Sequence, residues 1–355
     1  MAFRLRRILF GKPLRTEHAA HERLSIPLAL PIFASDALSS VAYATEAILI
    51  QLADARVPHE LFGVSRWISL GIVALILMVV ISYWQIIHAY PGGGGAYIVA
   101  RENLGEIAGL IAAASLLVDY VLTVAVSIAE GVAAALSALR QFPQLETLEE
   151  HKVWLCIAML LIITFLNLRG VRESGLWFAA PSYLFIFSML GLIAWGVGRS
   201  ALGMKPVQAV APPNPGIGLT GGLTLFLILR AFSSGCSALT GIEAVSNGVQ
   251  AFRKPEARNA AVTLVILGAL LAVMFTGITY LSNHYGIVPA EHLPDYGGEN
   301  THETVVSQIA RGTFGLSLPY YVIQAATALI LLLAANTSFA GFPRLASILA
   351  EDGFL

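Results

Sequence analysis

The amino-acid sequence predicts an all-α integral membrane protein with about eight membrane-spanning helices. Of its 355 residues, 57% are hydrophobic and only 12% are charged, whereas soluble domains carry roughly 25% charged residues. The apolar residues form long blocks instead of amphipathic stripes. Two of these blocks are interrupted near their middles by short polar strings, which indicates helices that are discontinuous inside the membrane.

A helix needs about 20 predominantly apolar residues to cross the hydrocarbon core of a bilayer. Eight blocks have a suitable composition, although the fourth is short and the last is long. They are residues 26–52, 68–89, 105–139, 153–168, 177–197, 222–251, 260–282 and 318–349.

The basic residues predict a cytoplasmic N-terminus, because cytoplasmic loops are enriched in lysine and arginine. With residues 1–24 in the cytoplasm, the cytoplasmic segments hold 13 basic residues and the outer segments hold 7. We therefore expect a multi-pass protein of the cell (inner) membrane. A cleaved signal peptide ending near Ala42–Ala44 is the alternative for the first block, but the apolar run continues to Ala53, which favours a membrane span.

The two polar strings resemble one another, which suggests an internal repeat. The first is Ser35–Ser40 (SDALSS) and the second is Cys236–Gly241 (CSALTG). Their blocks lie five spans apart, so they cross the membrane in opposite directions, as in an inverted repeat with broken helices. An unwound helix must place its unpaired backbone groups against a cavity or an ion, since each unpaired group in hydrocarbon costs several kcal/mol. The sequence therefore predicts that helices 1 and 6 are discontinuous and line a site.

The repeat also predicts how the chain is organised. The second copy holds only three spans before the chain ends, so we expect an incomplete inverted-repeat fold. The expected units are a basic cytoplasmic N-terminus (1–24), a first five-helix repeat (25–200), an extracellular linker (201–221) and a partial second repeat (222–355).

Ionisable side chains inside predicted spans mark candidate functional positions, because they cost about 2.5–3.5 kcal/mol each on insertion scales. They are Asp36, Glu46, Asp119, Glu130, Arg230 and Glu243. Asp36 lies near the middle of the first block, and Tyr43 follows seven residues later on the same helical face. The carboxylate of Asp36 could be a ligand, or it could cap the outer half of a broken helix.

Block three carries a polar stripe, because Asp119, Thr123, Ser127 and Glu130 share one helical face. Such a stripe should face the bundle interior or an aqueous path, although Ser127 could equally form a hydrogen bond between helices. In block six, Thr240 and Glu243 follow the second polar string. Glu243 could exchange protons near neutral pH or cap the inner half-helix.

Arg230 and Thr337 are expected to play supporting roles. Arg230, on the outer half of block six, could pair with a carboxylate or extend its charge towards the membrane surface. Thr337 lies in the string Asn336–Ser338 within block eight. This string could form a second ion site or bond neighbouring helices together.

Several functional classes are excluded. The net charge of −1 gives no general attraction to nucleic acid. The chain has no catalytic triad and no metal-ligand spacing of cysteine or histidine. The string Pro91–Gly95 (PGGGG) lacks the Lys-Ser/Thr of a phosphate-binding loop, so we interpret it as a flexible connection. We expect no enzyme activity, no cofactor and no nucleic-acid partner.

Three strings resemble the amino acid–polyamine–organocation superfamily, and within it the KUP-type, KimA-like potassium–proton symporters. They are Ser35–Ala44 (SDALSSVAYA), Tyr90–Tyr97 (YPGGGGAY) and Ser237–Gly248 (SALTGIEAVSNG). The resemblance implies a LeuT-like fold of five-plus-five inverted repeats, a cytosolic C-terminal domain and a homodimer. The resemblance further implies that this chain is truncated at its C-terminus.

The resemblance also implies a set of cation-pathway residues, with Glu243 linked to proton coupling. These positions are Asp36, Tyr43, Asp119, Thr123, Thr240 and Glu243, with potassium held at Asp36, Asp119 and Thr240. Ser127, Arg230 and Thr337 are expected around them. No cofactor is implied, because potassium ions and protons are the cargo.

Two transport functions and one inactive alternative follow. The leading hypothesis is proton-coupled potassium uptake by alternating access, because carboxylates and hydroxyls form an all-oxygen site. The second is a proton-coupled amino acid or amine permease. The first polar string has no glycine and carries Asp36, which should repel a substrate carboxylate. The third is an inactive truncated membrane component.

Overall fold

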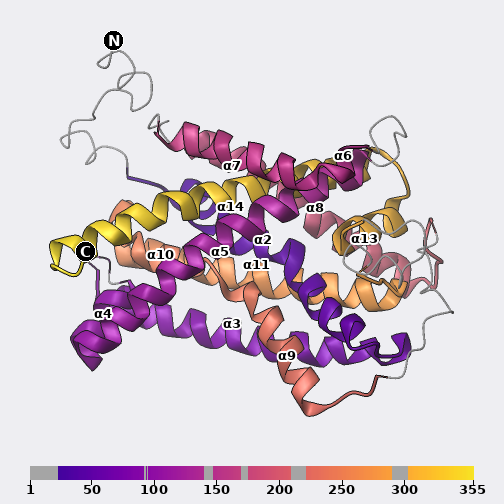
Figure 1. Ribbon diagram of the computed structural model, residues 1–355, viewed down its shortest axis with the longest axis horizontal. Coiled ribbons are helices and arrows are strands. Elements are labelled where there is room, and N and C mark those ends of the chain that lie inside the picture. Colours follow the sequence, from indigo (N-terminus) through magenta and orange to yellow (C-terminus); the bar gives the residue numbers. More distant parts are fainter. Residues whose placement is uncertain are drawn as a thin grey trace, which may run out of the picture.

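The computed structural model describes residues 23–91, 93, 95–139, 147–168, 175–208, 221–289 and 303–355, and Figure 1 shows them as an elongated bundle of helices. The predicted 1–24 segment and 201–221 linker lie mostly outside these ranges. The described residues contain one isolated backbone bridge and no named strand. The prediction of an all-α membrane protein is confirmed.

Each predicted apolar block is helical. The long helices are α2 (Ile26–Asp54), α3 (Val64–Ala89), α5 (Glu106–Leu139), α8 (Gly175–Ala201), α11 (Glu256–Tyr285) and α14 (Leu318–Glu351). Block four is the shorter α7 (Lys152–Leu168), and block six is α9 (Leu225–Gly235), η4 (Cys236–Leu239) and α10 (Ala244–Asn247). The remaining elements are η2 (His59–Gly63), α4 (Ala96–Leu104), α6 (Thr147–Glu150), η5 (Val249–Ala251) and α13 (Val305–Phe314).

Seven helices in the described part of the chain are long and apolar enough to cross a membrane, one fewer than the sequence predicts. The difference is α7, whose 17 residues fall just below the required length. Helix α14 ends at Glu351, slightly beyond its predicted block, whereas the 34 residues of α5 fall within theirs.

Helix α2 is the centre of the bundle. In its most apolar stretch 72% of the residues are buried, against 22% for the α3 span and 17% for α5. It packs against α8, α9, α11, α13 and α14. The outer faces of α3 and α5 instead expose large apolar side chains such as Trp67, Met78, Ile107 and Leu122. Exposed apolar faces of this extent suit contact with lipid acyl chains.

The predicted break in the first helix is wrong, because α2 is one uninterrupted α-helix from Ile26 to Asp54. The serines of the polar string stay in the helix by donating to backbone carbonyls one turn earlier. The Ser39 hydroxyl donates to the Asp36 carbonyl at 2.6 Å, and the Ser35 hydroxyl donates to the Ile32 carbonyl at 3.5 Å. The string also lacks a glycine, the residue that most readily leaves helical geometry.

The predicted break in block six is confirmed. Helix α9 ends at Gly235, the chain continues through the 3₁₀ turn η4, and α10 begins at Ala244. Between them Thr240 is extended and Gly241 has a φ of 80°. A Cβ atom at Gly241 would lie 2.6 Å from the backbone nitrogen of Ala37 and 2.8 Å from Cβ of Asp36. Gly241 therefore permits both the turn and its close approach to α2.

The backbone joins the beginning of α2 to the segment after α10. The Leu24 amide donates to the Ala251 carbonyl at 2.7 Å, and the Arg253 amide donates to the Leu24 carbonyl at 3.0 Å. An ion pair between Arg23 and Glu256 lies beside this link. The two polar strings are thus held together by their flanking segments as well as by direct packing.

Replacing Gly241 with Ala should lower the stability of the protein. The left-handed backbone costs a residue with a Cβ about 1–2 kcal/mol, and the contact with α2 adds an overpacking cost of about 1–3 kcal/mol. The comparison is Gly105→Ala, since Gly105 also has a positive φ but has open space around its Cβ position. Thermal unfolding in detergent should show a larger loss for G241A than for G105A. Equal losses would mean that the contact with α2 is unimportant.

Candidate functional site

A cavity of about 380 Å³ reaches the polar strings from one end of the bundle. Helices α2, α4, α5, α10 and α14 contribute to its walls. It lies towards the end of the bundle where Figure 1 shows α4, α10 and the C-terminus. Asp36 and Glu243 both line it, and none of the other described lining residues is lysine, arginine or histidine. The cavity therefore carries two acidic groups without a lining basic group.

Asp36 is buried on α2, with 6% of its surface exposed. Its Oδ2 accepts a hydrogen bond from the Ser338 hydroxyl on α14 at 3.4 Å. Its Oδ1 is buried and has no hydrogen-bond partner in the described part of the chain. A buried carboxylate oxygen without a partner is unfavourable unless a cation or a proton meets it. Because α2 is unbroken here, Asp36 does not cap a half-helix.

A row of hydroxyl groups connects α2 to the broken helix. The Ser40 hydroxyl lies 3.1 Å from the Tyr43 hydroxyl and 3.0 Å from the Thr240 hydroxyl. The Thr240 hydroxyl in turn donates to the Ser237 carbonyl at 2.9 Å. Tyr43 shares the face of Asp36, as the seven-residue spacing predicts, and the two side chains interact electrostatically.

Glu243 immediately precedes α10 and has 8% of its surface exposed. It occupies the N-cap position, but its side chain makes no capping hydrogen bond. The capping alternative is therefore not supported for Glu243. Its carboxylate instead faces the cavity that also contains Asp36.

The polar stripe of α5 faces the interior as predicted. Thr123 and Ser127 are buried, whereas Val121 and Leu122 beside them are exposed. Asp119 is half-buried, and its charge acts on both Asp36 and Glu243. Three carboxylates from three separate segments of the chain therefore lie within electrostatic reach of one another.

The expected supporting residues occupy different positions. Thr337 lines the cavity, and its hydroxyl donates to the Ala334 carbonyl at 2.8 Å. Arg230 is exposed on α9 and is not among the described lining residues, which agrees with the alternative that it extends its charge towards the membrane surface. Asn336 bonds helices together, because the Asn167 amide donates to its side-chain oxygen at 2.7 Å.

Sequence reasoning missed Ser40 and Ser338 as members of the site. Each belongs to a polar string that the sequence analysis recognised, but only the packing of α2 against η4 and α14 shows which hydroxyl faces Asp36 or Thr240. Sequence reasoning also missed the contribution of the glycine string to the cavity wall. Gly93 and Gly95 line the cavity, and a Cβ atom at Gly95 would lie 2.5 Å from Oδ1 of Asn247. Their absence of side chains lets this loop pack against the end of α10.

A polar latch lies beside the cavity, between α4 and the end of α14. Tyr97 on α4 donates to the Asp352 carboxylate at 2.6 Å, and Arg101 forms an ion pair with the same carboxylate. The hydrogen bonds from Tyr97 and Arg101 lower the pKa of Asp352 below its usual value. Asp352 therefore keeps its charge, and the latch, to a lower pH than an aspartate without these donors would.

The opposite end of the bundle is closed by a buried network around Glu303. Oε1 of Glu303 accepts from the Ser307 hydroxyl at 2.9 Å and from the Tyr320 hydroxyl at 3.1 Å. Oε2 forms an ion pair with Arg311 at 2.7 Å. The Tyr320 hydroxyl also reaches the Ser137 carbonyl at 3.1 Å. The network thus joins α13 to α5 and α14.

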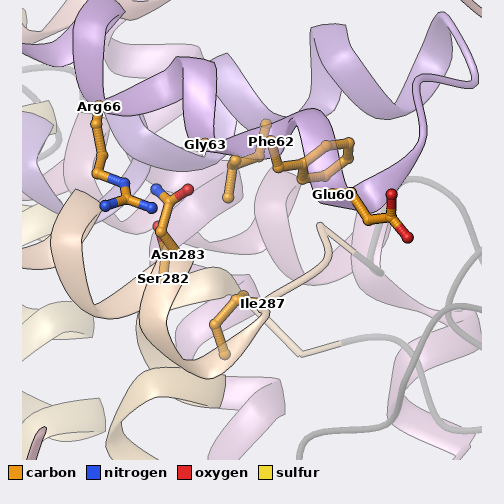
Figure 2. Close-up of a pocket in the computed structure, with 8 residues that line it drawn as sticks. Glu60, Phe62, Gly63, Arg66, Ser282, Asn283 and Ile287 are labelled. Atoms are coloured by element: carbon orange, nitrogen blue, oxygen red, sulfur yellow. The ribbon is translucent and has the colours of Figure 1, made fainter.

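A second cavity, of about 180 Å³, contains none of the predicted site residues. Figure 2 shows Arg66 and Asn283 pointing towards one another across it, with the Glu60 carboxylate turned away from them. The Asn283 amide donates to the Ser65 hydroxyl at 2.8 Å. Because Arg66 and Glu60 are exposed, we assign this hollow to the surface packing of α3 against α11.

Replacing Ser40 with Ala should remove the hydroxyl link between α2 and Thr240. Hydrogen bonds between membrane helices contribute about 0.6 kcal/mol on average and up to about 1.7 kcal/mol, so we expect a loss of stability in that range. Ser115→Ala is the matched control, because Ser115 is exposed and bonds only within its own helix. Unfolding in mixed micelles measures both variants, and equal stability of S40A and S115A would contradict the assigned link.

Comparison with known proteins agrees with this architecture. The chain matches the amino acid permease family over residues 33–355. It is 50% identical over 353 residues to the potassium transporter KimA of Bacillus subtilis (strain 168), which covers 99% of this chain and 54% of that protein. The chain thus spans about half the length of this curated relative. Both the family and the relative are transporters and not enzymes, in agreement with the prediction from the sequence. Since the family match includes most of its residues, the chain belongs to the amino acid permease family of the amino acid–polyamine–organocation superfamily.

Proposed function

We propose that this protein takes up potassium ions together with protons by alternating access. The observation that supports the proposal most strongly is the cavity that ends at Asp36 and Glu243 without a lysine, arginine or histidine among its described lining residues. An acidic cavity attracts cations and repels free carboxylates.

The available ligands suit an alkali cation. The free Oδ1 of Asp36, the Thr240 hydroxyl and the Asp119 carboxylate are all oxygen donors. Oxygen ligands replace the hydration shell of potassium in selective pathways. We propose these three residues as its principal ligands, with Tyr43 and Thr123 completing the pathway. Ser127 and Thr337 lie around this set.

The relative favours potassium over other cations, because the 50% identical protein is named a potassium transporter. The matched part of that relative includes almost the whole of this chain. All proposed ligand positions fall inside the region that matches the permease family.

The proposed mechanism needs two alternating openings. If residues 1–24 are cytoplasmic, as their basic charge suggests, the cavity opens to the cytoplasm and the Glu303 network closes the outer side. Opening outwards would then require this network to separate from α5 and α14. In this proposal the protein lies in the cell (inner) membrane and the observed arrangement faces inwards.

Glu243 is the proposed proton-coupling residue. It lies in the same cavity as Asp36, and its charge interacts with that of Asp119 as well. Binding a proton at Glu243 would reduce the negative charge of the site and so favour release of the cation. Deprotonation would restore the attraction for the next cation.

A cationic amine or amino acid is the second candidate substrate, because the family is described as amino acid permeases. An amine would also be attracted by Asp36 and Glu243, whereas the carboxylate of an amino acid would meet no lining basic group among the described residues. An inactive chain is the third candidate. The homodimer that the family resemblance implies stays a prediction.

Asp36→Asn and Glu243→Gln should both impair rubidium uptake, with different signatures. Losing a charged ligand costs about 1.5–3 kcal/mol, which corresponds to about a 10–100-fold weaker apparent affinity for D36N. E243Q should instead lose the dependence of uptake on the proton gradient. Uptake of labelled rubidium into proteoliposomes, with and without an inward proton gradient, measures both effects.

The matched control is Asp54→Asn, because Asp54 is an exposed carboxylate at the other end of α2. D54N should transport like the wild type. Unchanged uptake in both D36N and E243Q would contradict a cation site at this cavity. Saturable uptake of a labelled amine without rubidium uptake would favour the amine permease, and no flux of either substrate would support the inactive alternative.

A further inference from the structure

Glu46 and Glu130 form a second acidic pair that the proposed cation site does not use. Glu46 lies on α2, about one turn beyond Tyr43, and Glu130 lies on α5 at the end of the polar stripe. The charges of the two glutamates act on one another. Glu130 also interacts electrostatically with Tyr43, so the pair adjoins the hydroxyl row.

The two carboxylate oxygens of Glu46 have different environments. Glu46 is almost completely buried, with 1% of its surface exposed. Its Oε2 accepts a hydrogen bond at 3.0 Å from the Val305 amide, the first residue of α13. Its Oε1 is buried and has no hydrogen-bond partner among the residues that the structure describes. A buried carboxylate oxygen without a protein donor is costly to keep ionised, which favours a bound proton there.

The surrounding charges leave the pair acidic. Lys152, at the beginning of α7, acts on both glutamates and balances one of the two negative charges. Glu303, near the Val305 amide, is already paired with Arg311. Other charged or titratable groups on segments packed against α2 include Arg66 on α3, Arg199 on α8, Arg230 on α9, Glu243 before α10, His284 on α11 and Tyr320 on α14. One negative charge therefore remains to be neutralised at the pair.

A proton fits this position better than a metal cation. An alkali cation needs several oxygen ligands to replace its hydration shell, but among the described residues the hydrogen-bond partner of Glu46 is the Val305 amide, which is a donor. A proton needs only one carboxylate to bind and one oxygen to accept it. Two carboxylates close together cannot both stay ionised at low cost, so such pairs commonly share one proton.

We infer that Glu46 and Glu130 form a proton-binding site, separate from the cation site, on the side of Tyr43 that is remote from Asp36. The bound proton would neutralise the buried Glu46 carboxyl group beside the first turn of α13. Since α13 also carries the Glu303 network, the proton-binding pair adjoins the segment that closes this end of the bundle. This inference deepens the proposed proton coupling and rests on it only for its role in transport.

Infrared difference spectroscopy of the 355-residue chain in lipid, between acidic and alkaline pH, tests the site directly. Labelling the glutamate carboxyl groups with ¹³C separates their bands from those of aspartate. The wild type should show a protonated glutamate carboxyl band that Glu46→Gln abolishes. Glu130→Gln should shift the frequency of this band, because it removes the partner that shares the proton. Bands unchanged in both variants would overturn the inference.

Glu60→Gln is the matched control, because Glu60 is an exposed glutamate in η2, just before the first residue of α3. E60Q should keep the band at its wild-type frequency, and loss of the band in E60Q would also overturn the assignment. If E46Q fails to fold, the presence or absence of the frequency shift in E130Q tests the inference by itself. The measurement needs no potassium flux, so a protein that fails to transport rubidium but shows this band would disprove the proposed function and leave the proton site standing.

Discussion

Each polar group inside a bilayer must find its partner within the protein, and this requirement decides where the chain can leave the helix. An unpaired backbone group in hydrocarbon costs several kcal/mol. The structure satisfies the requirement in two ways at its two polar strings. On α2 the serine hydroxyls donate back to carbonyls, and the helix continues. At η4 the backbone turns away from the helix and packs against α2 through Gly241. The candidate site lies where this part of α2 packs against η4.

The two polar strings place acidic residues at the centre of the bundle in different ways. An unbroken α2 holds Asp36 rigidly, because the residue is fixed on a helix that is packed on several sides. The broken segment supplies Thr240 and Glu243 from a short non-helical stretch. A carboxylate on a continuous helix and groups from a non-helical stretch therefore meet at the candidate site. Glu46 is likewise fixed on α2, and its carboxylate accepts a hydrogen bond from the first residue of α13.

Much of this arrangement could be predicted from the sequence. The lengths of the apolar blocks gave the helices, and the 3.6-residue period placed Thr123 and Ser127 on the inner face of α5. The glycines at 235 and 241 located the true break. The sequence alone could not predict whether the serines of the first string would accompany an unwound backbone or bond to carbonyls within a continuous helix. Serine favours both unwound segments and hydroxyl bonding within a helix, so the continuity of α2 required knowledge of its neighbours. The inward direction of Ser338 and the outward direction of Arg230 likewise depend on how α9 and α14 rotate in the bundle.

The two hydrogen bonds between Leu24 and the segment after α10 involve backbone atoms alone. Side-chain substitutions at these positions leave the donors and acceptors in place, unless proline removes an amide. The link therefore fixes the beginning of α2 against the segment that follows the broken helix, at the mouth of the cavity. The relative position of these two segments is thus set by the backbone, and the side chains around the mouth can vary without removing the link.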